Sequence, residues 1–240
     1  MNHSVTKKSW LLLTVLGLIW GSTFMIIELA LKGVTPFWLA AARISIAAVI
    51  TNIIWFFSKK QLFQTQSKDW PTLIFSGVFA TAAPFIALSW GQQYVTSAFA
   101  GISMASVALL VLPLSYLFVT SEKITTTTVL GIFCGFCGVF ILLGPEVFMA
   151  SNDAREKYGR LACLFATFCY ATSAVLTRRL PPIDPIGLAA VSLTSGAIFV
   201  IPAAWLIEGG PPIVSKQTLF YLFILGLSLI HISEPTRRRG

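Results

Sequence analysis

The sequence predicts an all-α, polytopic membrane helix bundle made of two inverted five-helix repeats, the second of them incomplete. Three observations support this fold class. The 240 residues are 56% hydrophobic and 11% charged, with a mean hydropathy of +0.81, whereas a soluble domain has about 25% charged residues. About eight apolar runs alternate with short polar connections. The polar pattern of the first runs then recurs roughly 150 residues further along the chain.

Each apolar run is predicted to form one helix, and short connections make successive helices antiparallel neighbours. The first two runs have about 22 residues each, enough to cross a hydrocarbon core of about 30 Å. The eighth has about 13, fewer than the roughly 17 that a span requires. The runs are Trp10–Leu31, Pro36–Phe57, Trp70–Trp90, Val95–Val119, Thr126–Leu143, Leu161–Leu176, Ile186–Ile207 and Thr218–Ile230.

The recurrence is clearest at polar positions of the first two runs. Trp20–Thr23 aligns with Tyr170–Ser173 at an offset of 150, and Thr35-Pro36 aligns with Asp184-Pro185 at an offset of 149. Five predicted helices separate equivalent positions. Because five is odd, the second copy enters the membrane from the opposite face, as in many secondary transporters.

A polar stretch at residues 144–160 is the predicted boundary between the two halves. We divide the chain into a first repeat at residues 1–146, a connecting loop at 147–158, a partial second repeat at 159–230 and a tail at 231–240. The tail breaks the apolar pattern abruptly and resembles translated vector or adapter sequence. We therefore expect the tail to be non-native and the natural gene product to be longer.

The distribution of basic residues predicts the orientation in the membrane. The side that holds the N-terminus carries eight Lys and Arg residues, against five on the opposite side. By the positive-inside rule the N-terminus is cytoplasmic. We expect a multi-pass protein of the cell membrane, the inner membrane where there are two.

Several stretches resemble the EamA-type module of the drug/metabolite transporter superfamily. The resemblance covers residues 10–144 well and residues 158–230 more loosely, and it implies a ten-helix bundle of two inverted modules that moves small metabolites. The chain departs from that pattern where its second module stops inside the third helix. The stretches that carry the resemblance are Leu18–Phe24, Thr35–Arg43, Ala87–Ala98, Leu112-Pro113, Glu122–Ile124 and Gly131–Gly144.

Two charged residues lie inside the first helical pair, where an unpaired charge is costly. Glu28 and Arg43 fall at similar depth in an antiparallel hairpin. A structural ion pair is one interpretation. The others are recognition of a charged substrate by Arg43, which the resemblance favours, and proton coupling by Glu28.

Other polar and aromatic residues inside the runs are candidate substrate contacts. Packing between helices and marking of the membrane interface are the alternatives for these residues. Two prolines inside runs, Pro84 and Pro113, remove backbone hydrogen bonds and are candidate hinges. The candidate contacts are Trp20, Thr23, Trp90, Gln93, Ser103, Ser106, Tyr170 and Ser173.

The sequence indicates a transporter and not an enzyme. The four cysteines lie inside apolar runs and are interpreted as packing residues, and no motif predicts a metal, a cofactor or nucleic-acid binding. We expect a secondary transporter of small metabolites or drugs, as an exporter or a proton-coupled exchanger. The alternative is a non-transporting membrane subunit or scaffold. The expected partners are a small-molecule substrate and the lipid bilayer, and a homodimer is left open.

The predicted orientation can be tested by labelling single cysteines in intact cells. Gln64→Cys and Asn152→Cys should react with a membrane-impermeant maleimide from opposite faces, because an odd number of helices separates them. Labelling of both cysteines from outside would contradict the arrangement.

Overall fold

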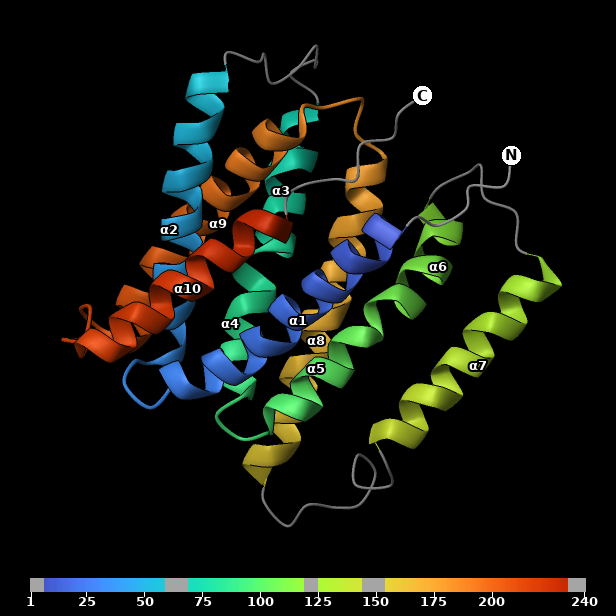
Figure 1. The fold of residues 1–240 in the computed structure, drawn as a ribbon, viewed down its shortest axis with the longest axis horizontal. Coiled ribbons are helices and arrows are strands. Elements are labelled where there is room, and N and C mark those ends of the chain that lie inside the picture. The colour runs from blue at the N-terminus through green and yellow to red at the C-terminus, as the bar shows by residue number, and fades with distance from the viewer. Residues whose placement is uncertain (1–6, 59–68, 119–124, 144–153, 233–240) are drawn as a thin grey trace.

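The fold was analysed in a computed structural model, which describes residues 7–58, 69–118, 125–143 and 154–232. Gln64, Asn152 and most of the predicted loop and tail lie outside these ranges. Every regular element among the described residues is a helix (Figure 1). The helices are α1 (Lys7–Ala30), α2 (Pro36–Ser58), α3 (Trp70–Ala80), α4 (Ala82–Gly91), α5 (Ser97–Ala105), α6 (Val107–Phe118), α7 (Thr126–Leu143), α8 (Ala154–Arg178), α9 (Pro185–Glu208) and α10 (Lys216–Ile232).

Two of the predicted helices are each broken into two segments. The first break lies at Thr81, between α3 and α4, three residues before Pro84. A proline ring clashes with the carbonyl group four residues earlier, so Pro84 explains this break. The second lies at Ser106, between α5 and α6, whereas α6 continues through Pro113. With each broken pair counted as one span, the described helices follow the eight predicted runs.

Two helices extend beyond the bounds that the sequence analysis gives to the second repeat. Helix α8 begins at Ala154 and not near residue 159, so the last five residues of the predicted loop are helical. Its first turns are polar but are supported by an ion pair between Glu156 and Arg160, one turn apart. Helix α10 likewise continues to Ile232, two residues into the predicted tail.

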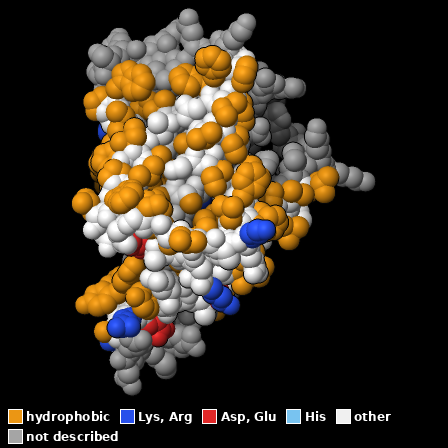
Figure 2. All heavy atoms as spheres, turned by 90° about the vertical axis from the view of Figure 1, so that its left-hand side faces the viewer, with side chains coloured by type: hydrophobic (Ala, Val, Ile, Leu, Met, Phe, Trp, Pro, Cys, Tyr) orange, Lys and Arg blue, Asp and Glu red, His pale blue; other side chains and the backbone are white. Residues whose placement is uncertain are grey.

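The surface of the bundle is apolar enough for lipid. Among the described residues, five spans have the length and composition to cross a membrane, and three shorter helices are also apolar. Phe56 on α2, Leu206 on α9 and Phe220 on α10 are exposed. Figure 2 shows the side of the bundle that lies on the left in Figure 1. Hydrophobic side chains cover much of it, and a few charged side chains lie in its lower half.

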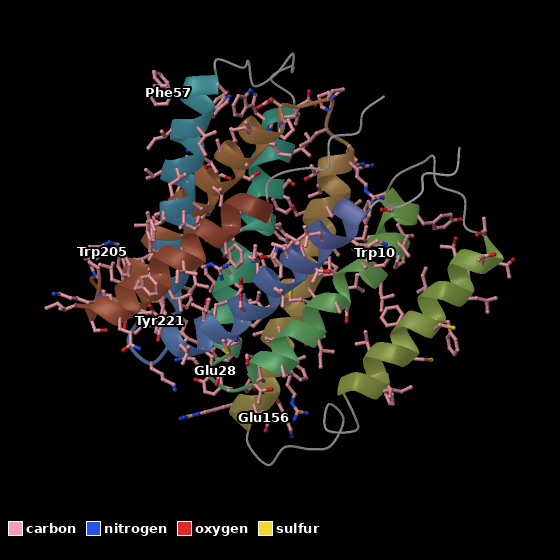
Figure 3. The ribbon with its side chains drawn as sticks, viewed as in Figure 1. Trp10, Glu28, Phe57, Glu156, Trp205 and Tyr221 are labelled. Carbon is pink, nitrogen blue, oxygen red and sulfur yellow. The ribbon has the colours of Figure 1, made fainter. Side chains whose placement is uncertain are left out.

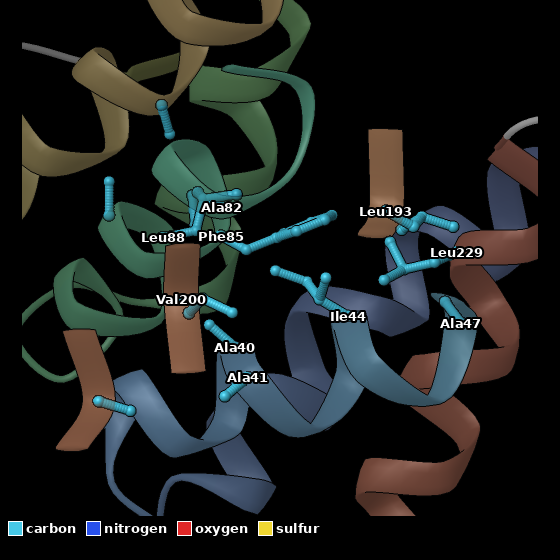
Figure 4. Packing of buried hydrophobic residues seen from close by; sticks show 14 of the residues in the cluster. Ala40, Ala41, Ile44, Ala47, Ala82, Phe85, Leu88, Leu193, Val200 and Leu229 are labelled. Carbon is cyan, nitrogen blue, oxygen red and sulfur yellow. The ribbon is translucent and has the colours of Figure 1, made fainter. Parts of the chain in front are cut away.

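The packing centres on α2 and α9, which make the most extensive helix–helix contact of the described chain. Helix α10 packs beside α2, while α3 and α4 pack against α8 and α9. Helix α7 lies at the edge of the bundle beside α5 and α6 (Figure 1). The buried core combines small residues such as Ala40, Ala47 and Ala204 with larger ones such as Phe85 (Figure 4).

The two ends of the bundle carry different side chains. In Figure 3, Glu28, Glu156 and Tyr221 lie in the lower half of the bundle, whereas Phe57 lies at the upper end of α2. With a cytoplasmic N-terminus, the C-terminal end of α1, where Glu28 lies, faces outward. The lower end in Figure 3 is therefore the end that the sequence predicts to face outward.

Gly77 of α3 is a point of close helix approach. A Cβ atom there would lie 2.8 Å from the Cα of Ser192 on α9, so the α9 backbone would have to move. We expect Gly77→Ala to lower the stability by about 1–3 kcal/mol, measured as thermal unfolding of the purified protein in detergent. Gly138→Ala is the matched control, because nothing lies within 4 Å of the added atom. Equal melting temperatures for the two variants would contradict this packing.

Candidate functional site

A cavity of about 220 Å³ lies between the two halves of the chain. Its walls come from the α3–α4 break on one side and from α8, α9 and α10 on the other. The lining extends to Thr177, near the end of α8, and to Pro185, the first residue of α9. The connection between these two helices lies at the upper end in Figure 1. The lining residues are Ala80, Thr81, Phe85, Tyr170, Ser173, Thr177, Pro185, Leu188, Ala189, Ser192, Leu193 and Leu229.

Two aromatic rings form one wall of the cavity. Phe85 of α4 and Tyr170 of α8 meet edge to face, with ring centroids 5.9 Å apart and an interplanar angle of 79°. Such a contact adds roughly 0.5–1.5 kcal/mol beyond burial. The pair joins the first half of the chain to the second at the level of the cavity.

Hydroxyl groups link α3 to α8 beside these rings. The Ser173 hydroxyl donates to the carbonyl oxygen of Ser76 at 2.9 Å, and the hydroxyls of Ser76 and Thr177 lie 2.8 Å apart. Ser173 and Thr177 both line the cavity. Because these hydroxyls have two lone pairs and a rotatable proton, they can also exchange partners with a polar solute.

The break at Thr81 places a further hydroxyl at the cavity wall. Thr81 Oγ1 lies 2.8 Å from the carbonyl oxygen of Gly77 and 3.3 Å from that of Ser192 on α9. Sequence analysis missed both Thr81 and Ser192. The signal that could have found Thr81 is Pro84, since a proline disrupts the helix about one turn before itself.

Arg43 of α2 is fully buried next to this wall. Its guanidinium carbon lies 4.0 Å from the centroid of the Phe85 ring. All three guanidinium nitrogens lack a hydrogen-bond partner among the described residues. A charge inside a membrane costs roughly 2.5–3.5 kcal/mol on insertion scales, and a desolvated cation–π contact returns about 2 kcal/mol. The contact with Phe85 therefore offsets only part of the free-energy cost of burying the Arg43 cation.

Arg43 does not form the ion pair that was one interpretation of the sequence. Glu28 is exposed on α1 and lies at the lower end in Figure 3, while Arg43 is buried without a hydrogen-bond partner among the described residues. Helices α1 and α2, which the sequence predicts to be antiparallel neighbours, make no extensive contact with each other, because α10 packs against both. Their order in the chain therefore does not bring the two charges together.

The structure brings only some of the predicted contact residues together. Tyr170 and Ser173 line the cavity, but their sequence counterparts do not. Trp20 is 46% exposed, and the Thr23 hydroxyl donates to the carbonyl oxygen of Ile19 on its own helix.

The remaining predicted contacts lie elsewhere in the bundle. Trp90 meets Tyr94 edge to face near the end of α4, and Gln93 is exposed. Ser103 and Ser106 are buried, and Thr167 of α8 donates to the Ser103 carbonyl oxygen at 3.2 Å. None of these four residues is in the cavity lining.

A carboxylate from α9 caps the N-terminus of α2. Glu208 accepts hydrogen bonds from the backbone N–H groups of Phe37 and Trp38, both at 3.1 Å, and from the Thr35 hydroxyl. The Trp38 indole N–H donates to the carbonyl oxygen of Gly209 at 3.1 Å. We call these contacts the α2–α9 clasp. It satisfies donors that a helix start leaves open, and it joins α2 to the C-terminal end of α9.

A second cavity, of about 400 Å³, lies beside the clasp between α2, α9 and α10. Its lining includes Trp38, Trp205 and Leu222, with Ser45 as the only hydroxyl side chain. Because the first cavity has more hydroxyl groups and lies next to the buried cation, it is the better candidate for a solute site.

Comparison with known proteins finds a transporter family and individual transporters. The profile of the EamA-like transporter family matches residues 7–144. An uncharacterized transporter of Archaeoglobus fulgidus is 26% identical over 196 residues, which are 81% of this chain and 67% of that protein. The uncharacterized transporter YoaV of Bacillus subtilis is 25% identical over 81% of this chain and 65% of its own length. The chain thus spans about two thirds of the length of these two relatives.

A solved crystal structure shares the fold. It superposes with a TM-score of 0.62 over 92% of this chain and 76% of that one, at 19% sequence identity. At this identity the match supports the helix arrangement alone.

The clasp should contribute measurably to stability. Replacing Glu208 with alanine leaves two backbone N–H groups without their acceptor, and we expect a loss of roughly 1–2 kcal/mol. Thermal unfolding in detergent measures this loss. Asp69→Ala is the matched control, because Asp69 precedes α3 without making a side-chain cap hydrogen bond. A Glu208→Ala variant as stable as this control would show that the clasp is energetically neutral.

Proposed function

Because the chain belongs to the EamA-like transporter family, we propose that it acts in secondary transport of small metabolites or drugs across the cytoplasmic membrane, as an exporter or a proton-coupled exchanger. The observation that carries this proposal is the cavity that lies between the two halves of the chain. Aromatic rings and hydroxyl groups in its wall suit a small amphipathic solute, which buries an apolar body and needs a few hydrogen bonds.

The pairing of helices supports an inverted repeat. If α1, α2 and α3–α4 correspond to α8, α9 and α10, the α2–α9 contact maps onto itself. The contact of α3 with α9 then maps onto that of α10 with α2, and the contact of α3–α4 with α8 maps onto that of α10 with α1. All of these pairs are in contact. A solute site near the axis of such a repeat is the usual arrangement in secondary transporters.

The clasp and the cavity lie toward opposite ends of α9. The clasp involves Glu208 at its C-terminal end, whereas the cavity extends to Pro185 at its N-terminal end. With the N-terminus in the cytoplasm, the clasp closes the outer side and the cavity faces inward. An exporter loads its solute from that side. Opening outward would then require α2 and α9 to separate at the clasp.

Solute counterflow in sealed vesicles tests the proposal. The protein is reconstituted and assayed against a panel of labelled metabolites with and without an imposed pH gradient. Saturable counterflow supports transport, and its response to the gradient separates a proton-coupled exchanger from an uncoupled exporter. Vesicles with no saturable flux for any solute would favour the non-transporting subunit.

Filling the cavity should stop transport. Leu188 lines the cavity, so Leu188→Trp should lower the maximal flux at least tenfold at equal membrane abundance. Ile198→Trp adds the same ring to an exposed position of the same helix and is expected to keep near-normal flux. Equal flux from the two variants would show that the solute does not pass through this cavity.

A further inference from the structure

We infer that the solute carries a single carboxylate group, which pairs with Arg43. This inference rests on the proposed transport function and specifies its substrate class. The geometry that carries it is a fully buried guanidinium group without a hydrogen-bond partner among the described residues, placed 4.0 Å from an aromatic ring of the cavity wall.

The guanidinium of Arg43 has five N–H donors in a planar fork. Buried polar groups in native proteins nearly always have partners, so an arginine with all three nitrogens unsatisfied indicates a missing acceptor. The Phe85 ring covers one face of the guanidinium group, but a cation–π contact is not a hydrogen bond to any of its N–H groups. A carboxylate fits the fork with two parallel hydrogen bonds.

Charge balance limits the solute to one negative charge. Among the described lining residues none is Asp, Glu, Lys or Arg, and the guanidinium group of Arg43 lies against the ring of one lining residue, Phe85. A carboxylate neutralises this cation. A phosphate ester carries about −1.5 to −2 at neutral pH, which would leave excess negative charge in an apolar setting. A cationic solute would meet repulsion with no acidic lining side chain to offset it.

The remaining lining defines the rest of the solute. Phe85, Tyr170 and Leu193 offer an apolar surface next to the cation, and Ser173 and Ser192 add hydroxyl groups. Phe85 lies against Arg43 and also lines the cavity. Because Arg43 itself is not among the lining residues, the proposed pairing requires the Phe85 ring to turn aside before a carboxylate can reach the guanidinium group.

Two isosteric probes test the charge preference directly. Benzoate and benzamide have the same shape, but only benzoate carries a negative charge. Binding of each probe to the purified protein in detergent is measured by isothermal titration calorimetry. We expect benzoate to bind at least tenfold more tightly than benzamide, and more tightly than phenyl phosphate. Equal binding of benzoate and benzamide would overturn the inference, and tighter binding of phenyl phosphate would overturn the choice of a carboxylate.

Variants of Arg43 assign the preference to this residue. In Arg43→Gln the two probes should bind within threefold of each other. In Arg43→Lys the preference should shrink but persist, because an ammonium group keeps the charge and loses the fork. Arg160→Gln is the matched control. Arg160 also faces a phenylalanine ring, that of Phe99 at 5.8 Å. It lies near the N-terminal end of α8, whereas the cavity-lining residues of α8 lie in its C-terminal half. An unchanged preference in Arg43→Gln would refute the assignment.

The wild-type comparison needs no variant, so the inference can fail even if Arg43→Gln does not fold. It can also fail separately from the proposed function. Saturable counterflow of neutral or cationic solutes, together with equal binding of benzoate and benzamide, would leave a transporter without an anion site. A tenfold preference for benzoate in the wild type, lost in Arg43→Gln, supports the carboxylate class whatever the direction of transport.

Discussion

The close packing of α2 against α9 is the constraint on which the rest of the structure depends. Lipid is as apolar as a leucine side chain, so helices in a membrane associate through van der Waals contact and interhelical hydrogen bonds. Both helices bury small residues, such as Ala40 and Ala47 on α2 and Ala190 on α9, and small side chains permit close approach of helices. The clasp then fixes one end of the pair. Both the buried cation and one wall of the cavity are carried by these two helices.

The broken helix α3–α4 turns this packing into a candidate site. An intact helix would satisfy its own backbone and present only side chains to α9. The break at Thr81 instead lets a threonine hydroxyl approach carbonyl oxygens of two helices, and it places Phe85 one turn later against Arg43. Irregular backbone inside a membrane is tolerated where protein or a cavity surrounds it, and here both do.

Arg43 is costly for a protein that has only to fold. The Phe85 ring offsets part of the burial cost, yet the guanidinium nitrogens remain without hydrogen-bond partners among the described residues. An uncompensated charge at the interface of two halves favours any arrangement that supplies an acceptor. In the transport that we propose, a solute that supplies this acceptor links its own binding to the movement of the halves, since a ligand shifts a conformational equilibrium only by its differential affinity.

The sequence by itself determined the class of fold and most helix boundaries, because long apolar runs must be helical in a membrane whatever their neighbours; α7, Thr126–Leu143, was predicted to the residue. It also marked Arg43, Tyr170 and Ser173, since polar groups inside such runs stand out. Only the tertiary structure decided that Glu208 caps α2, from 170 residues away, and that Glu28 is exposed while Arg43 is buried without a hydrogen-bond partner among the described residues. Those outcomes depend on helix rotation and on contacts between distant segments, and the periodicity of a single run specifies neither.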